Sequence, residues 1–187
     1  MNALRWPLRR ARELILGGGV IAYATEAVFG LGCDPLNAQA VARILAIKQR
    51  DAAKGFILIA ADISQLEPFM QIDQRMRTAL LETWPGPVTW VVPASGGVPE
   101  YLTGGRDTLA VRVTAHPVAR ALCEATGLAL VSTSANLSGH SPLRSPITVR
   151  RLLGKHVDYV VPGTVGGLKK PTEIRDARTG AVLRAGQ

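Results

Sequence analysis

The stretch "LALVSTSANLSGHS", Leu128 to Ser141, decides the fold because it places the end of a buried strand beside a block of hydrogen-bonding side chains. Its apolar run suits a strand, and Ser, Thr and Asn follow directly before a glycine. Such side chains bond readily to nearby backbone, so the block can be a turn that caps itself. The alternative is a cradle for an anion or a sugar. The stretch alone leaves both interpretations open.

Strand and helix patterns alternate along the rest of the chain, which predicts an α/β domain around one sheet. We expect helices over 8–16, 37–50, 76–83 and 116–126, and strands over 20–24, 55–61, 88–92, 108–114, 128–132 and 158–163. Residues 172–186 read as a hairpin with Thr179-Gly180 at its turn. The hairpin and the proline-rich middle argue against a purely parallel, doubly wound sheet. We therefore predict a twisted mixed β-sheet with flanking helices in a single domain, 1–187.

The composition indicates a folded cytoplasmic protein. The chain has 187 residues, 47% of them hydrophobic, and every long apolar run is interrupted by a charge or by glycines. Arginines alternate with apolar residues near the N-terminus, as in an amphipathic helix, so we expect neither a secretory signal nor a membrane span. Cys33 and Cys123 are far apart and in no metal-binding pattern, which favours reduced, structural cysteines and no bound zinc.

The charge balance favours a polyanionic ligand. Twenty-two Lys and Arg against fourteen Asp and Glu give a net charge of +8, which attracts RNA, nucleotides or phosphorylated substrates. The alternative is that many basic proteins bind no nucleic acid. Phosphate-loop, dinucleotide, serine-hydrolase and zinc-protease motifs are missing, and His116 before Pro117 reads as a helix-start residue. A site of hydroxyls, amides and cations remains, and that set suits displacement at phosphorus with a metal ion carried in by the nucleotide.

Two sets of cations are candidates for such a site. Lys48 and Arg50 lie at the end of a predicted helix, where the helix dipole alone can explain them as exposed cations. Arg112 interrupts an apolar strand and shares a face with Ala110, so it faces either solvent or, as we favour, a lined cleft.

The segment "YATEAVFGLGCD", Tyr23 to Asp34, is ambiguous by itself. A strand is expected to end at Thr25-Glu26, after which Gly30 and Gly32 let the backbone pass closely against something. The alternative is a glycine-softened turn packed on a phenylalanine.

Five segments in order make the chain similar to the YrdC/TsaC family of threonylcarbamoyl-AMP synthases. The similarity runs from about residue 8 to the C-terminus, and the segments are "YATEAVFGLGCD", the K-x-R of Lys48 and Arg50, "WPGPVT" at 84–89, "TLAVRVTAHP" at 108–117 and the S-x-N of Ser134 and Asn136, followed by the tail "PTEIRDARTGAVLRAG".

The resemblance implies a concave mixed sheet with a positively charged cavity. It implies that L-threonine, bicarbonate and ATP with Mg²⁺ become threonylcarbamoyl-AMP and pyrophosphate, and that partner proteins use the product to modify tRNA. Its site residues would be Lys48 and Arg50 at the phosphates, in the catalytic role; Ser134 and Asn136, with Thr108, Thr172 and Arg184, on the nucleotide; and Thr25, Arg112 and Ser132 on threonine.

Two departures from the family pattern concern the site. Ala24 stands where proline is usual before Thr25, and Asp51 follows the K-x-R where proline is common, which could loosen that loop or partly neutralise Arg50. The short chain resembles the single-domain bacterial branch.

Two alternative functions stay open at this point. A non-catalytic module that binds double-stranded or ribosomal RNA is the main alternative, and an enzyme of the same fold acting on another carbamoyl or phosphate substrate is the second.

Overall fold

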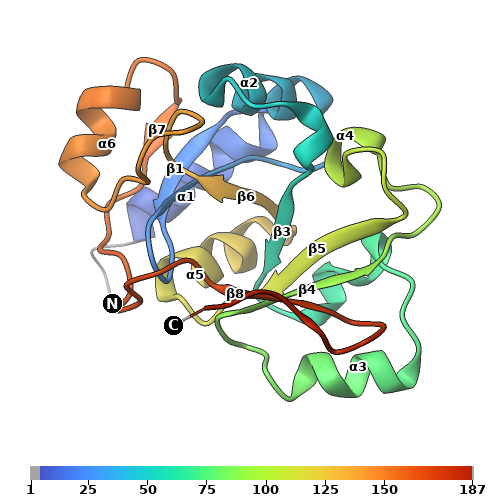
Figure 1. The fold of residues 1–187 in the computed structure, drawn as a ribbon. Helices are drawn as coiled ribbons and strands as arrows, with labels where there is room; N and C mark the ends of the chain where they lie inside the picture. The colour runs from blue at the N-terminus through green and yellow to red at the C-terminus, as the bar shows by residue number, and fades with distance from the viewer. Residues whose placement is uncertain (1–4, 187) are drawn as a thin grey trace.

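The structure is a computed structural model that describes residues 5–186, and within them nine strands form one twisted sheet (Figure 1). The strand order is β7-β1-β2-β6-β3-β5-β4-β8-β9. Three neighbouring pairs, β1/β7, β3/β5 and β4/β8, are parallel and the others are antiparallel, which confirms the mixed sheet. The strands are β1 (Ile21–Ala24), β2 (Phe29–Gly32), β3 (Ile57–Ala60), β4 (Val88–Pro93), β5 (Thr108–Val113), β6 (Leu130–Ser134), β7 (Tyr159–Val160), β8 (Glu173–Asp176) and β9 (Val182–Arg184).

The helices begin and end close to the predicted positions where the capping chemistry is clear. Asn37 caps the helix after it, its side chain accepting from the backbone N of Ala40 at 2.9 Å, and Gly127 ends α5 in the left-handed conformation. The helices are α1 (Arg5–Leu16), α2 (Ala38–Lys48), α3 (Gln74–Leu81), α4 (Glu100–Thr103), α5 (Pro117–Thr126) and α6 (Pro146–Leu153), with short 3₁₀ turns η1 (Ala52–Lys54), η2 (Ile63–Gln65) and η3 (Glu67–Phe69).

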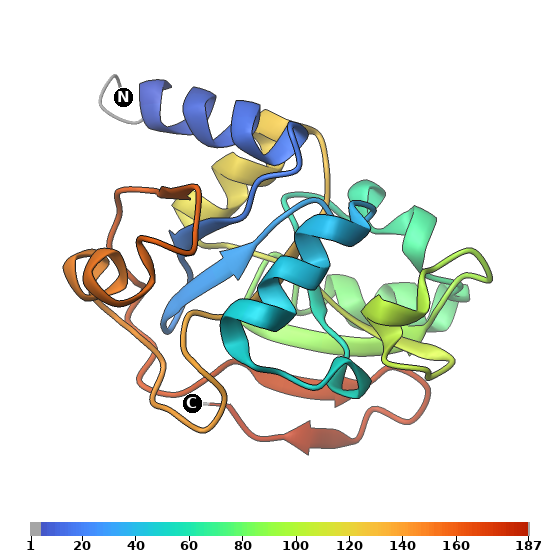
Figure 2. The same ribbon diagram turned by 90° about the horizontal axis from the view of Figure 1, so that it is seen from above.

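The sheet separates two apolar cores because successive strand residues point to opposite faces. On β1, Ile21 and Tyr23 pack with α1 and α5, whereas Ala22 and Ala24 belong to the core that includes α2, α3 and α6. Viewed from above, α1 and α5 lie side by side on one side of the sheet and α2 lies on the other (Figure 2).

Strand β2 was missed by sequence reasoning, which read its segment as a turn or a close approach of backbone. Glycine weakens the strand pattern, and two of the four β2 residues are glycines. The structure shows why Gly32 is there: a Cβ at this position would lie 2.6 Å from the carbonyl oxygen of Val131 and 2.7 Å from the Tyr23 ring. The glycines therefore let β2 fit between β1 and β6. Helix α6 was also not predicted.

The face under α1 and α5 continues beyond these helices and becomes the floor of a cavity. Leu130 on β6 packs with the α5 core, and Ser132 and Ser134, two and four residues on, share its face. On β3, Ile59 and Ile57 also share one face, and Ile59 packs in the core while Ile57 lines the cavity. In the described part of the chain, α1 and α5 contribute no residue to that lining. The sheet thus leaves part of one face uncovered.

Candidate functional site

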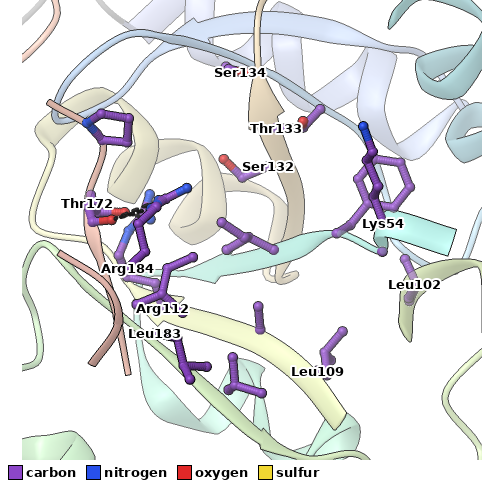
Figure 3. A pocket seen from close by; sticks show the side chains of 18 of the residues that line it. Lys54, Leu102, Leu109, Arg112, Ser132, Thr133, Ser134, Thr172, Leu183 and Arg184 are labelled. Atoms are coloured by element: carbon purple, nitrogen blue, oxygen red, sulfur yellow. Dashed lines mark hydrogen bonds between the residues drawn. The ribbon is translucent and has the colours of Figure 1, made fainter. Parts of the chain in front are cut away.

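A cavity of about 460 Å³ lies over the uncovered part of the sheet, between β2, β5, β6 and the β8–β9 hairpin (Figure 3). It brings together side chains from residue 25 to residue 184. The sequence-predicted residues that line it are Thr25, Arg50, Thr108, Arg112, Ser132, Ser134, Thr172 and Arg184. Lys48 and Asn136 lie outside its lining.

Arg112 is held at one end of the cavity and is only 4% exposed. Its Nη1 donates to the hydroxyls of Thr89 at 3.0 Å and Thr172 at 3.1 Å. Its Nη2 donates to a carboxylate oxygen of Glu26 at 3.2 Å. The lined cleft that we favoured for Arg112 is therefore confirmed. Its Nε is buried without a partner in the described structure, so this edge of the guanidinium has a donor to offer a ligand.

Glu26 is a site residue that sequence reasoning missed. The sequence marked it only as part of a strand end, whereas in the structure it bonds Arg112 and accepts from the Thr114 hydroxyl at 2.6 Å. Arg184 lies at the same end, where it donates to the Thr172 carbonyl oxygen at 2.8 Å. Burial, and then the nearby Arg112, lower the pKa of Arg184. Two guanidiniums face one carboxylate here, which leaves one positive charge for an anionic ligand group.

Lys48 is buried and binds the C-terminal end of β6 and the loop that follows it. It is 2% exposed, so the alternative that Lys48 is an exposed helix-end cation is wrong. Its Nζ donates to the Ser134 carbonyl oxygen and to the backbone and side-chain oxygens of Asn136 at 3.0 and 3.2 Å. Burial, and then Arg50, lower the pKa of Lys48 to about 8. Lys48 therefore fixes the loop that carries Ser134.

Asn136 faces the other side of that loop. Its amide nitrogen donates to the carbonyl oxygens of Leu137 at 2.9 Å and His140 at 2.7 Å. It lines a second, largely apolar cavity of about 840 Å³ between α2, α6 and the loop. The self-capping turn is thus observed at Asn136, whereas Ser132 and Ser134 line the first cavity, and a cradle for an anion or a sugar there stays a prediction.

Thr25 and Arg50 border the cavity on loops that bear the two departures. Thr25 follows Ala24 directly and is fixed by donation from its hydroxyl to the Val28 carbonyl oxygen at 2.7 Å. Asp51 caps η1, its side chain accepting from a backbone N at 2.9 Å, and residues 5–186 show no ion pair between Asp51 and Arg50. Of the two effects considered for Asp51, a partial neutralisation of Arg50 through an ion pair is therefore not seen among these residues.

Two further cations line the cavity and were not predicted, Lys54 and Arg106. Lys54 ends the short 3₁₀ turn η1 and Arg106 lies in the loop before β5, and no periodic pattern marks either position. His116, by contrast, stands at the predicted helix start before α5, with its Nε2 3.1 Å from the Thr164 carbonyl oxygen and outside the cavity lining. The described residues contain no group of three side chains suited to hold a metal ion.

Comparison with known proteins shows which family the chain belongs to. A family model named Sua5/YciO/YrdC and described as telomere recombination matches residues 13–186. The chain belongs to the Sua5/YciO/YrdC family. A relative from Nitrosococcus oceani, named threonylcarbamoyl-AMP synthase, is 55% identical over 98% of this chain and 100% of its own length. One from Halorhodospira halophila with the same name is 56% identical over 95% of this chain and 93% of its own.

A solved structure of this family agrees with the fold. The crystal structure of P. abyssi Sua5 complexed with L-threonine superposes with a TM-score of 0.90 at 33% identity. The match covers 97% of this chain, which spans 54% of the length of that Sua5 chain. The YrdC-like fold inferred from the sequence is thereby confirmed.

Proposed function

We propose that this chain is a threonylcarbamoyl-AMP synthase, which converts L-threonine, bicarbonate and ATP into threonylcarbamoyl-AMP, pyrophosphate and water. One observation carries the proposal. A single cavity offers anion-binding groups at both ends and hydroxyls along β6 between them, in a chain that is similar over its full length to proteins of that name.

The Arg112 end suits the amino acid. A carboxylate accepts well from a guanidinium edge, and Arg112 has a buried Nε to offer beside the Nη2 that touches Glu26. Arg184 supplies the second positive charge there. Thr25 and Ser132 border the same part of the cavity with hydroxyls, which can bond the threonine side chain or its amino group.

The nucleotide would extend from this end toward Arg50. Arg50 and the hydroxyls of Thr108 and Ser134 line the wall that it would follow, and Thr172 and Arg184 border its other side. Lys48 and Asn136 then act from behind, because they fix the loop that presents Ser134. Magnesium would enter with ATP on its phosphate oxygens, because no carboxylate lies among the described residues that line the cavity.

The chemistry asks little covalent help from the protein. The neutral threonine nitrogen attacks the bicarbonate carbon, a carbon–oxygen bond of bicarbonate breaks with loss of water, and a carbamate forms. A carbamate oxygen then attacks the α-phosphorus of ATP. The bond from that phosphorus to the bridging oxygen breaks, and pyrophosphate leaves with the electron pair. Charge grows on oxygens that Arg50 and its neighbours can stabilise, so positioning and electrostatics supply the rate.

This activity makes the chain a nucleotidyltransferase of tRNA processing. Its product would pass, in the cytoplasm, to the proteins that transfer the threonylcarbamoyl group to tRNA adenosine. None of the helices of residues 5–186 is long and apolar enough to span a membrane.

The proposal is tested by incubating the purified protein with ATP, magnesium, bicarbonate and single amino acids. We expect pyrophosphate release that requires both threonine and bicarbonate, with threonylcarbamoyl-AMP detected by mass spectrometry. Release with another amino acid alone would point to a related enzyme of this fold. Tight, salt-sensitive binding of double-stranded RNA without any turnover would instead favour the RNA-binding module.

A further inference from the structure

The second cavity, of about 840 Å³, is an apolar hollow on the surface between α2, α6 and the loop that follows β6 (Figure 1). We call it the α2–α6 groove. Its apolar lining consists of Ala46, Ile47, Leu137, Leu143, Leu152 and Leu153. Leu137 is 37% exposed and Leu152 is 54% exposed. Apolar side chains that gather in one exposed hollow, unlike single ones scattered over a surface, mark a place where another molecule binds.

Hydrogen bonds fix the walls of the groove. The backbone N of Ser138 donates to the Lys48 carbonyl oxygen at 2.8 Å, which joins the loop to the end of α2. The Asn136 amide donates to the carbonyl oxygens of Leu137 and His140 at 2.9 and 2.7 Å. A surface that already has its shape loses little conformational entropy on binding, so a partner can bind here without rearranging the loop.

The charges around the groove are almost all positive. The exposed cations of α6 and of the turn that follows it are Arg150, Arg151 and Lys155. Within residues 5–186 none of the three forms an ion pair. Segments 37–48 and 135–158 build the groove, and their only acidic residue is Asp158, which already pairs with Arg43 at 2.9 Å. The border of the groove is therefore free to attract acidic groups.

An apolar groove with a positive border selects among the possible occupants. RNA would engage the cations, but its phosphates and sugars suit a polar surface and leave the leucines without apolar contacts. A second copy of this chain would bring the same positive border, because a twofold interface places one patch against itself, and like charges repel. An amphipathic helix flanked by Asp and Glu matches both the apolar lining and the charge.

Asn136 connects the groove to the first cavity. Its side chain lines the groove, while its backbone and side-chain oxygens accept from Lys48 Nζ at 3.0 and 3.2 Å. The same ammonium group donates to the carbonyl oxygen of Ser134, which lines the first cavity. A partner in the groove therefore contacts the loop that presents Ser134, without blocking the first cavity.

We propose that the α2–α6 groove is a docking site for an amphipathic helix of another protein, one whose apolar face is flanked by Asp and Glu. Leu137 and Leu152 pack against the apolar face of that helix, and Arg151 and Lys155 pair with its acidic flank. The docking site lies outside the cavity of the proposed function, and its affinity for such a helix does not depend on turnover.

Two synthetic helical peptides test the docking site by fluorescence anisotropy. Both carry leucines at positions i, i+3, i+4 and i+7, flanked by glutamates in one peptide and by lysines in the other. We expect the wild-type protein to bind the glutamate peptide at least about tenfold more tightly than the lysine peptide. Leu152→Ala should weaken binding of the glutamate peptide about tenfold, because most of an apolar contact is lost. Ile147→Ala is the matched control, since Ile147 lies on the same helix, is 74% exposed and is outside the groove lining.

Reversing one charge tests the border of the groove separately. Arg151→Glu should reduce the preference for the glutamate peptide about fivefold, because an attraction becomes a repulsion. Arg75→Glu is the matched control, since it reverses an exposed arginine on α3 outside the groove, and it should leave the preference unchanged.

Three peptide results would overturn the docking site: no binding of the glutamate peptide by the wild type, equal affinity for the two peptides, or equal affinity in Leu152→Ala. A wild-type dimer that Leu152→Ala dissociates in sedimentation velocity would show that a second copy fills the groove instead. Binding of duplex RNA or of phosphatidylglycerol vesicles that Leu152→Ala weakens as much would assign the groove to those ligands. Unchanged circular dichroism and unchanged ATP affinity show that the variants are folded.

Discussion

At the residue scale, the site depends on polar side chains that are buried and bonded to other parts of the protein. Arg112 and Glu26 form an ion pair whose side chains are 5% and 10% exposed, and Lys48 is buried beneath the β6 loop. Charges in such positions are expensive unless they are bonded. These residues therefore shape the cavity before they touch any substrate, and their variants should affect stability and binding in separable ways.

Removing the Glu26 carboxylate should destabilise the protein strongly. Glu26→Ala leaves Arg112 buried without its partner, and a loss of about 3 kcal/mol in the free energy of unfolding is expected, measured by urea denaturation. The control is Glu124→Ala, which breaks the exposed pair with Arg120 and should cost less than about 1 kcal/mol. Equal losses in the two variants would contradict the buried role of Glu26.

Lys48 should give ATP binding an alkaline limit. Because its pKa is lowered to about 8, the ammonium loses its charge well below the usual range for lysine, and the β6 loop loses a donor. We expect ATP affinity to fall about three- to tenfold as the pH passes 8, from the loss of a charged hydrogen bond. Calorimetry on the wild type and on Lys48→Arg, which stays charged, is the measurement.

The stability effect of the same titration has the opposite sign. The folded pKa lies below the unfolded one, so between about pH 8 and about pH 10.4 the unfolded chain binds more protons, and the contribution of Lys48 to stability rises with pH. For the binding prediction, an ATP affinity of the wild type that stays constant over the same pH window would contradict a role for the charge on Lys48.

At the element scale, β2 and β6 position the site, and one of them rests on glycine. β6 turns Ser132 and Ser134 toward the cavity because they share the face of Leu130, a relation that the strand pattern predicts. β2 fits closely beside it because Gly32 lacks a side chain, and the two glycines of β2 weaken the strand pattern in the sequence. The alternation of side chains along the sequence therefore predicts β6, but it cannot predict β2, where glycines leave no side chains to form a pattern.

Adding a methyl group to β2 tests that packing. Gly32→Ala would place a Cβ 2.6 Å from the Val131 carbonyl oxygen, so an overpacking loss of about 1–3 kcal/mol is expected in the free energy of unfolding. Gly97→Ala is the control, because nothing lies within 4 Å of its added Cβ. A Gly32→Ala protein as stable as the Gly97→Ala protein would contradict the close fit of β2.

At the scale of the whole molecule, one cavity has two differently charged ends. At the Arg112 end the arginine is buried and paired with Glu26, whereas Lys54 and Arg106 at the other end are exposed and form no ion pair within residues 5–186. The mixed sheet and most of the site residues could be predicted from the sequence together with its resemblance to a known family. Glu26, Lys54 and Arg106 could not, because their importance arises from contacts between segments far apart in the chain.

The two ends should respond differently to salt. Exposed charges are screened within about 8 Å at physiological ionic strength, while buried pairs are screened much less. Raising the sodium chloride concentration should therefore weaken ATP binding severalfold and leave L-threonine binding almost unchanged, as followed by calorimetry. Parallel losses for both ligands would contradict the placement of the amino acid at the buried Arg112 end.

The most direct measurement compares L-threonine with L-threoninol, in which an alcohol replaces the carboxylate, in the pyrophosphate-release assay with the wild-type protein, ATP, magnesium and bicarbonate. We predict threonine-dependent release and none above background with threoninol, because Arg112 then has no carboxylate to bind. Equal release with both compounds, or release that needs neither, would contradict the account.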